Sequence, residues 1–295
     1  MQNHRPSAVS YHQIGGRRLA LRRWGASDGP PLLLLHGSRD NSITFQFLVD
    51  ALGDHWQILA PDLRGHGLSE PVPAIWQHEL LGDICQLIRD LLPERPLPVV
   101  GHSMGGNLAL ALAALRPGRV SHVVSLDALG TPPNTPLRSA AAVLGKYLDE
   151  LEHKGFRTPR GYSTIDEMAE RLVRANPRLG RQRADWLARH SSRHGADGLL
   201  YWLHDINLSR SLGLLFNDAE WDMLFQRIAC PLLYLASSDP TRHDPATFRS
   251  ELARKSRCIA RLDWDQLPET GHNLHHELPE VMAGRIETFL GTQPR

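Results

Sequence analysis

The first 130 residues alternate short apolar runs with longer amphipathic stretches. Dense apolar runs are typical of strands buried on both faces of a parallel sheet, and the amphipathic stretches have helical spacing. An opening hairpin is expected where Gly15-Gly16 separates two alternating segments. The predicted strands are Tyr11–Ile14, Arg18–Trp24, Pro31–Leu35, Trp56–Ala60, Leu97–Val100 and Val120–Leu126. The predicted helices are Ser42–Leu52, Ile75–Leu92 and Met104–Leu115. This alternation predicts βαβ units and therefore an α/β protein.

The pattern changes after residue 130, where Thr131–Pro136 has the composition of a hinge-like linker. Helical signals continue to residue 221, but buried strand runs are absent. The alternation then returns with the predicted elements Leu232–Ala236 (strand), Pro245–Lys255 (helix), Cys258–Leu262 (strand) and a helix near Pro279–Leu290. We therefore predict an α/β core made of residues 1–130 and 222–295, interrupted by a helical insertion over 131–221.

Composition and charge exclude several function classes. The formal net charge is +1, from 33 basic and 32 acidic residues, so no global field favours nucleic acid or an anionic membrane. The three cysteines are too sparse for a disulfide framework or a cysteine-based zinc site. The polar start of the chain has no apolar signal segment. We expect a cytoplasmic protein, a monomer or homodimer, that acts on a small molecule without nucleic-acid or membrane partners.

The segment Gly101–Gly106 contains the pattern G-x-S-x-G centred on Ser103. The pattern alone is weak, but here it stands between a predicted buried strand and an Ala/Leu-rich helix, as a nucleophile elbow requires. Glycine on either side of the serine removes collisions in so tight a turn. The following helix directs its positive end, and the backbone N–H of Met104, toward the site. The context predicts Ser103 as a nucleophile.

Four segments together resemble the α/β-hydrolase superfamily, in its cap-bearing esterase, lactonase and C–C hydrolase branch. They are His36–Ser38, Asp62–Ser69, Gly101–Gly106 and Gly271–Asn273. The resemblance implies a mostly parallel eight-stranded sheet flanked by helices, with residues 131–221 as a helical cap that covers the substrate. It also implies that the Asp62–Ser69 loop is structural, with Asp62 and Arg64 paired or hydrogen-bonded.

The resemblance further implies the partners of Ser103. An oxyanion hole is expected from the backbone N–H groups of Ser38 and Met104. His272, after Gly271, is the expected base. The chain order Ser, Asp, His allows two acids, because both Asp239 and Asp127 follow predicted strands. Most of the family carries its acid at the position that matches Asp239, so Asp239 is favoured and Asp127 is the alternative.

These residues predict a serine hydrolase that cleaves a small-molecule ester or lactone through an acyl-enzyme, with no cofactor. His272–His276 lacks a metal-binding spacing, so no metal is expected. The alternatives are C–C bond hydrolysis or other acyl transfer on the same triad, and a ligand receptor that retains the fold. The segment Ser38–Asn41 is not the glycine-rich loop typical of C–C hydrolases, which counts against C–C bond hydrolysis. The related epoxide hydrolases and haloalkane dehalogenases need aspartate at position 103, so the serine found there disfavours both activities.

The seven arginines of residues 171–193 are expected on a solvated outer face of the insertion.

Overall fold

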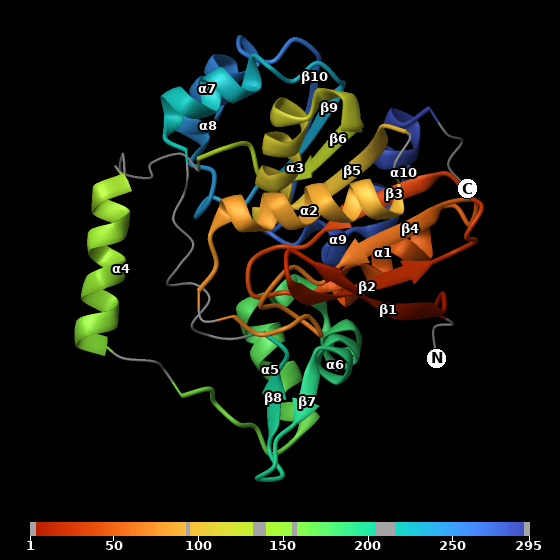
Figure 1. Cartoon of the computed structure of the whole chain (residues 1–295), viewed down its shortest axis with the longest axis vertical. Coiled ribbons are helices and arrows are strands. Elements are labelled where there is room, and N and C mark those ends of the chain that lie inside the picture. Colours follow the sequence, from red (N-terminus) through yellow and green to blue (C-terminus); the bar gives the residue numbers. More distant parts are fainter. Residues whose placement is uncertain are drawn as a thin grey trace.

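The computed structural model describes residues 4–72, 74–92, 95–131, 140–154, 158–204 and 216–291. Within them, one sheet has eight strands in the order β1-β2-β4-β3-β5-β6-β9-β10, and it is parallel from β4 to β10. The mostly parallel eight-stranded sheet is confirmed (Figure 1). The strands are β1 (Ser7–Ile14), β2 (Arg17–Trp24), β3 (Pro31–Leu35), β4 (Gln57–Pro61), β5 (Leu97–His102), β6 (Val120–Leu126), β9 (Leu232–Ser237) and β10 (Leu262–Leu267).

Helices cover both faces of the sheet, because the buried strands are apolar on both sides. Along β3, Leu33 and Leu35 enter one core while Leu32 and Leu34 enter the other, as the two-residue repeat of a strand requires. The first core is closed by α2 (Gln77–Leu91), α3 (Met104–Leu115), α7 (Asp218–Phe225) and α8 (Pro245–Ser256). The second is closed by α1 (Gln46–Ala51), α9 (Leu274–Glu277) and α10 (Pro279–Phe289).

One predicted strand is wrong. Cys258–Leu262 was expected to be the last strand, but β10 begins only at Leu262 and runs to Leu267. The apolar run follows the end of α8, where Ile259 is buried in the first core from a loop. β10 lies at the sheet edge, so polar residues such as Asp263 and Asp265 are tolerated on it and hide the strand pattern.

The loop after β4, Asp62–Ser69, is not held by the expected pairing of Asp62 with Arg64. Asp62 instead accepts backbone hydrogen bonds from Ser42 N (2.6 Å) and Leu68 N (2.7 Å). Arg64 forms a buried bidentate ion pair with Asp83 of α2, with both nitrogen–oxygen distances 2.7 Å. The loop therefore connects the segment after β3 to α2: Asp62 binds backbone N–H groups, and Arg64 binds the carboxylate of Asp83.

The insertion lies between β6 and β9 and contains α4 (Ala140–Lys154), α5 (Ile165–Ala175), α6 (Arg181–His190) and the short strands β7 (Ser192–His194) and β8 (Leu200–Trp202). Its α5–α6 unit has a small core of its own, to which Phe47 of α1 also contributes. Arg183 of α6 donates to the carbonyl oxygens of His276 (2.6 Å) and Glu277 (3.2 Å) on α9. One of the seven arginines thus attaches the insertion to the core.

The two predicted boundaries of the insertion lie near residue 131 and at 221/222. The expected linker lies outside the described residues except for Thr131. The expected boundary at 221/222 falls inside α7, where Trp221 is buried against Phe225 and the side of Gly130. Helix α7, which begins at Asp218, also contacts α3. Figure 1 shows α4 apart from the α5–α6 unit, on the other side of the molecule from β1.

Candidate active site

Ser103 occupies a strained turn between β5 and α3. Its backbone has φ 53° and ψ −115°, a conformation that costs energy for any residue with a side chain. A Cβ on Gly101 would lie 2.2 Å from the carbonyl oxygen of Gly105. A Cβ on Gly105 would lie 2.0 Å from the carbonyl oxygen of Leu35. Glycine is therefore required on both sides of Ser103, and the turn has the shape expected of a nucleophile elbow.

The segment after β3 lies directly against this turn. A Cβ on Gly37 would lie 3.5 Å from Cβ of Ser103. His36 is buried and donates from Nδ1 to the carbonyl oxygen of Gly37 (2.7 Å), while its Nε2 accepts from Leu63 N (3.0 Å). Burial lowers the pKa of His36 to about 4, so the imidazole is neutral and fixed as one tautomer. The neutral His36 thus fixes the loop that carries Ser38 through these two hydrogen bonds.

His272 contacts Asp127. Its Nδ1 lies 2.6 Å from Oδ2 of Asp127, which follows β6 directly. The positive φ of Asp127, 54°, turns its chain at the strand end, and its side chain is fully buried. Because β6 is the neighbour of β5, this carboxylate lies one strand away from the elbow that carries Ser103.

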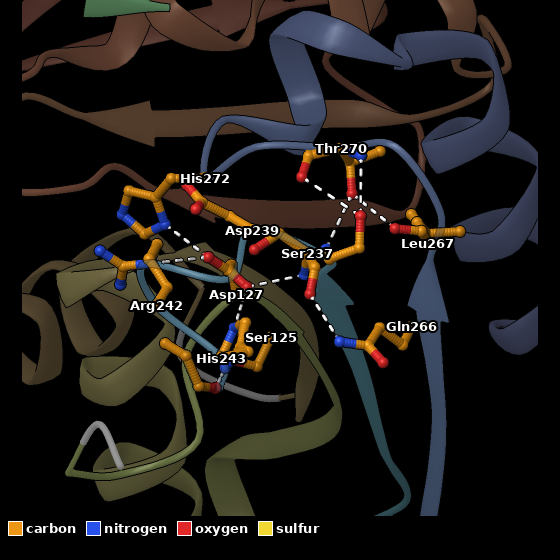
Figure 2. A network of polar contacts seen from close by, with 12 residues as sticks. Ser125, Asp127, Ser237, Asp239, Arg242, His243, Gln266, Leu267, Thr270 and His272 are labelled. Carbon is orange, nitrogen blue, oxygen red and sulfur yellow. Dashed lines mark hydrogen bonds and ion pairs between the residues drawn. The ribbon is translucent and has the colours of Figure 1, made fainter. Parts of the chain in front are cut away.

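Three further donors surround the Asp127 carboxylate (Figure 2). Oδ1 accepts from Ser237 N and from His243 Nε2, both at 2.7 Å, and Oδ2 accepts from Arg242 Nε at 3.0 Å. Burial raises the pKa of Asp127, but hydrogen bonds from His243 and His272 outweigh burial and hold that pKa well below its usual range. The carboxylate is therefore ionised and fixed on both oxygens.

The structure corrects the expected pairing of Asp239 with His272. Oδ1 of Asp239 instead accepts from its own turn, from Thr241 N (2.9 Å) and Thr241 Oγ1 (2.7 Å). The carbonyl oxygen of Asp239 accepts from the backbone N–H groups of Arg242 (3.1 Å) and His243 (2.9 Å). The loop after β9 thus brings two nitrogen donors to Asp127, whereas Oδ1 of Asp239 itself accepts hydrogen bonds within a local turn.

Sequence reasoning missed Arg242, His243 and His102 as members of this site. The first two follow Asp239 closely, but nothing in their spacing indicates that they face the end of β6. His102 was seen only as part of the G-x-S-x-G pattern. It is buried, and its Nε2 donates to the carbonyl oxygen of His272 at 2.9 Å. This bond joins the residue before Ser103 to the loop that carries the expected base.

The chain belongs to the α/β-hydrolase family and is a hydrolase, since residues 30–278 match the family model described as "alpha/beta hydrolase fold". A "Serine hydrolase-like protein" of Danio rerio is 30% identical over 279 residues, which cover 92% of this chain and 84% of that protein. A "Probable serine hydrolase" of Drosophila melanogaster is 28% identical, covering 90% of this chain and 82% of that one.

Solved structures show the same fold. The thioesterase domain from the curacin biosynthetic pathway matches with a TM-score of 0.82 and 24% identity, covering 96% of this chain and 99% of that one. E-2-(acetamidomethylene)succinate hydrolase matches with a TM-score of 0.77 and 24% identity, covering 97% and 100%. Among the described helices, none combines the length and the apolar character needed to cross a bilayer.

Proposed function

We propose that this hydrolase cleaves a carboxylic ester or lactone of a small molecule, with Ser103 as nucleophile, His272 as base and Asp127 as acid. The 2.6 Å contact between His272 Nδ1 and Asp127 Oδ2, one strand away from the strained Ser103 elbow, carries this proposal. A serine hydroxyl is a weak nucleophile until a neighbouring base removes its proton. The contact leaves Nε2 of His272 as the nitrogen that takes that proton.

The reaction then follows from the roles of these groups. Ser103 Oγ attacks the carbonyl carbon while His272 accepts the hydroxyl proton, and Asp127 stabilises the imidazolium that forms. The backbone N–H groups of Ser38 and Met104 donate to the oxyanion. His272 returns the proton to the leaving alcohol, which departs and leaves an acyl group on Ser103. Water, activated by the same histidine, hydrolyses this acyl-enzyme.

Two local features support the oxyanion assignment. Met104 is the first residue of α3, so its N–H belongs to the end of the helix where unpaired N–H groups and positive potential are found. A Cβ on Gly37 would lie in van der Waals contact with Cβ of Ser103, at 3.5 Å. Ser38, the next residue, therefore lies at the same end of β3 as the nucleophile.

The insertion supplies the cover that such chemistry uses. Its α5–α6 unit is attached to α9 through Arg183, next to the loop that carries His272. We propose that residues 131 to about 217 form a cap that excludes water and sets which acyl and alcohol groups enter. The solved thioesterase domain with the same fold is consistent with acyl chemistry on this scaffold.

Covalent labelling tests the proposal. A fluorophosphonate should phosphonylate Ser103 in the folded protein, and peptide mass spectrometry should place the adduct on that residue. The Ser103→Ala variant is the matched control and should remain unlabelled with an unchanged melting temperature. An adduct on another serine, or equal labelling of Ser103→Ala, would exclude Ser103 as the nucleophile.

A further inference from the structure

A cluster of potential metal ligands lies beside the active site, formed by Asp40, His102 and His275. One ring nitrogen from each histidine and one carboxylate oxygen of Asp40 all lie within 4.8 Å of one another. The three residues come from the loop after β3, the end of β5 and helix α9. His102 and His275 are 3% and 0% exposed, while Asp40 is partly exposed.

The hydrogen bonds around the two histidines decide which nitrogens face the cluster. His102 uses Nε2 to donate to the carbonyl oxygen of His272, so Nε2 carries the proton and Nδ1 has a free lone pair. Nε2 of His275 lies 3.0 Å from Thr44 Oγ1. Thr44 Oγ1 also lies 2.6 Å from Nε2 of His276. In the neutral tautomer of His275 whose Nε2 donates to Thr44 Oγ1, Nδ1 also has a free lone pair.

Both Nδ1 atoms are buried and have no hydrogen-bond partner among the described residues. A buried acceptor without a donor destabilises the folded protein, because the atom has lost its hydrogen bonds to water. Two imidazole lone pairs and a carboxylate are three acceptors, and a cation satisfies all three at once. Gly37 keeps the space beside His102 open, since a Cβ there would lie 2.9 Å from Nδ1 of His102.

We propose that Asp40, His102 and His275 bind a divalent transition-metal ion of the zinc class. Imidazole nitrogen and carboxylate oxygen bind zinc at about 2.0–2.2 Å, which places tetrahedral ligands roughly 3.4 Å apart. Small side-chain movements bring the three ligand atoms to that separation. Water fills the fourth position. The three ligands match a two-histidine, one-carboxylate set, which suits zinc and iron-class ions better than magnesium or calcium.

The bound ion inhibits hydrolysis, an inference that rests on the proposed function. His102 precedes Ser103, its ring centroid is 4.6 Å from that of His272, and its Nε2 holds the backbone of His272. Asp40 lies two residues beyond Ser38, the proposed oxyanion donor. Drawing His102 and Asp40 together around an ion therefore displaces groups on two sides of Ser103. A small displacement of such groups reduces the rate strongly.

Binding is tested first, without reference to activity. Metal-free protein is titrated with zinc chloride against a chromogenic chelator, and we expect one high-affinity ion per chain. Asp40→Asn keeps the side-chain shape and should weaken zinc binding at least ~10-fold. Asp239→Asn, a carboxylate outside the cluster, and Ser103→Ala should both bind zinc like the wild type. Circular dichroism and the melting temperature check the fold of each variant.

Activity is tested second. Zinc should lower kcat of the wild type with one bound ion, EDTA should restore it, and Asp40→Asn should resist inhibition. Absence of a bound ion, or equal affinity in Asp40→Asn, would overturn the site. Loss of binding in His272→Ala with full binding in Asp40→Asn would place the ion on the catalytic histidine instead and would also overturn it. If the protein hydrolyses no ester, the zinc-binding measurements still test the proposed metal site by themselves.

Discussion

Asp127 has more partners than the orientation of one histidine requires. Besides His272, it accepts hydrogen bonds from His243, Arg242 and the backbone of Ser237. Hydrogen bonds to a charged group are stronger than neutral ones, and a buried carboxylate is stable only when it has them. We infer that His243 and Arg242 act as positioning residues, which hold the carboxylate ionised and aligned with His272 without touching substrate.

Replacing His243 should reduce turnover while leaving substrate affinity almost unchanged. His243→Ala removes a buried donor to a charged group, worth about 1.5–3 kcal/mol, which corresponds to roughly 10- to 150-fold in kcat. KM should change little. His243→Gln retains an N–H donor and should recover part of the loss. Steady-state kinetics on both variants measures the split, and equal kcat in the two variants would refute a role in positioning Asp127.

The sequence predicts Ser103 and His272 as nucleophile and base, but it does not decide which aspartate contacts His272. Asp127 and Asp239 both follow strands, and the difference lies in their local turns. Thr241 donates two hydrogen bonds to Oδ1 of Asp239. Asp127 has a positive φ at the end of β6, and its side chain contacts His272. Similarly, the Asp40, His102 and His275 cluster joins three distant segments, which no spacing along the chain reveals.

At the scale of elements, the β5–α3 turn depends on close backbone contact between neighbouring segments. Gly105 lies so near β3 that even one added carbon meets the carbonyl oxygen of Leu35. This contact holds the first turn of α3 against the sheet and fixes the direction of the elbow.

Gly105→Ala should therefore destabilise the protein, by about 1–3 kcal/mol or more, because the backbone must move to admit the Cβ. Gly82→Ala is the matched control. Gly82 is exposed within α2, where an added Cβ meets nothing within 4 Å, so alanine should stabilise by about 0.5–1 kcal/mol. Urea unfolding measures both changes. A Gly105→Ala variant as stable as the wild type would contradict the described packing.

The central strands and the α/β class are readable from the sequence because they are dense apolar runs bounded by glycine or proline. β3 and β6 were predicted to the residue, as Pro31–Leu35 and Val120–Leu126. β10 was misplaced because an edge strand exposes one side and carries polar residues. The division at 221/222 stays a prediction, although it falls inside α7, a helix that contacts α3.

At the scale of the whole molecule, the folded chain buries neutral histidines. In the unfolded chain the same histidines are exposed to water and take up protons near pH 6.5. His36 and His66 are fully buried, with ring centroids 5.0 Å apart. Burial lowers the pKa of His36 to about 4 and that of His66 to about 3, from an ordinary value of 6.5. Asp40, whose pKa burial raises to about 6, opposes this effect with a single proton.

Stability should therefore fall as the pH falls from about 6.5 toward 4. Below 6.5 the unfolded chain binds protons that the folded histidines refuse, so acid favours unfolding, with each histidine contributing at most about 1.4 kcal/mol per pH unit. Urea unfolding across this range measures the slope. His66→Asn should make it shallower, whereas His194→Gln, at an exposed position, should leave it unchanged. A flat profile in the wild type would contradict neutral burial.

The comparison of Asp127→Asn with Asp239→Asn tests the proposed triad most directly. Asparagine at 127 favours the wrong tautomer of His272, so kcat on an aryl ester should fall by up to about 10⁴-fold. Asparagine at 239 keeps an oxygen for the Thr241 turn, so kcat should remain close to that of the wild type. Both proteins should match the wild type in circular dichroism. A large loss in Asp239→Asn with Asp127→Asn nearly active would contradict the assignment of Asp127 as the acid.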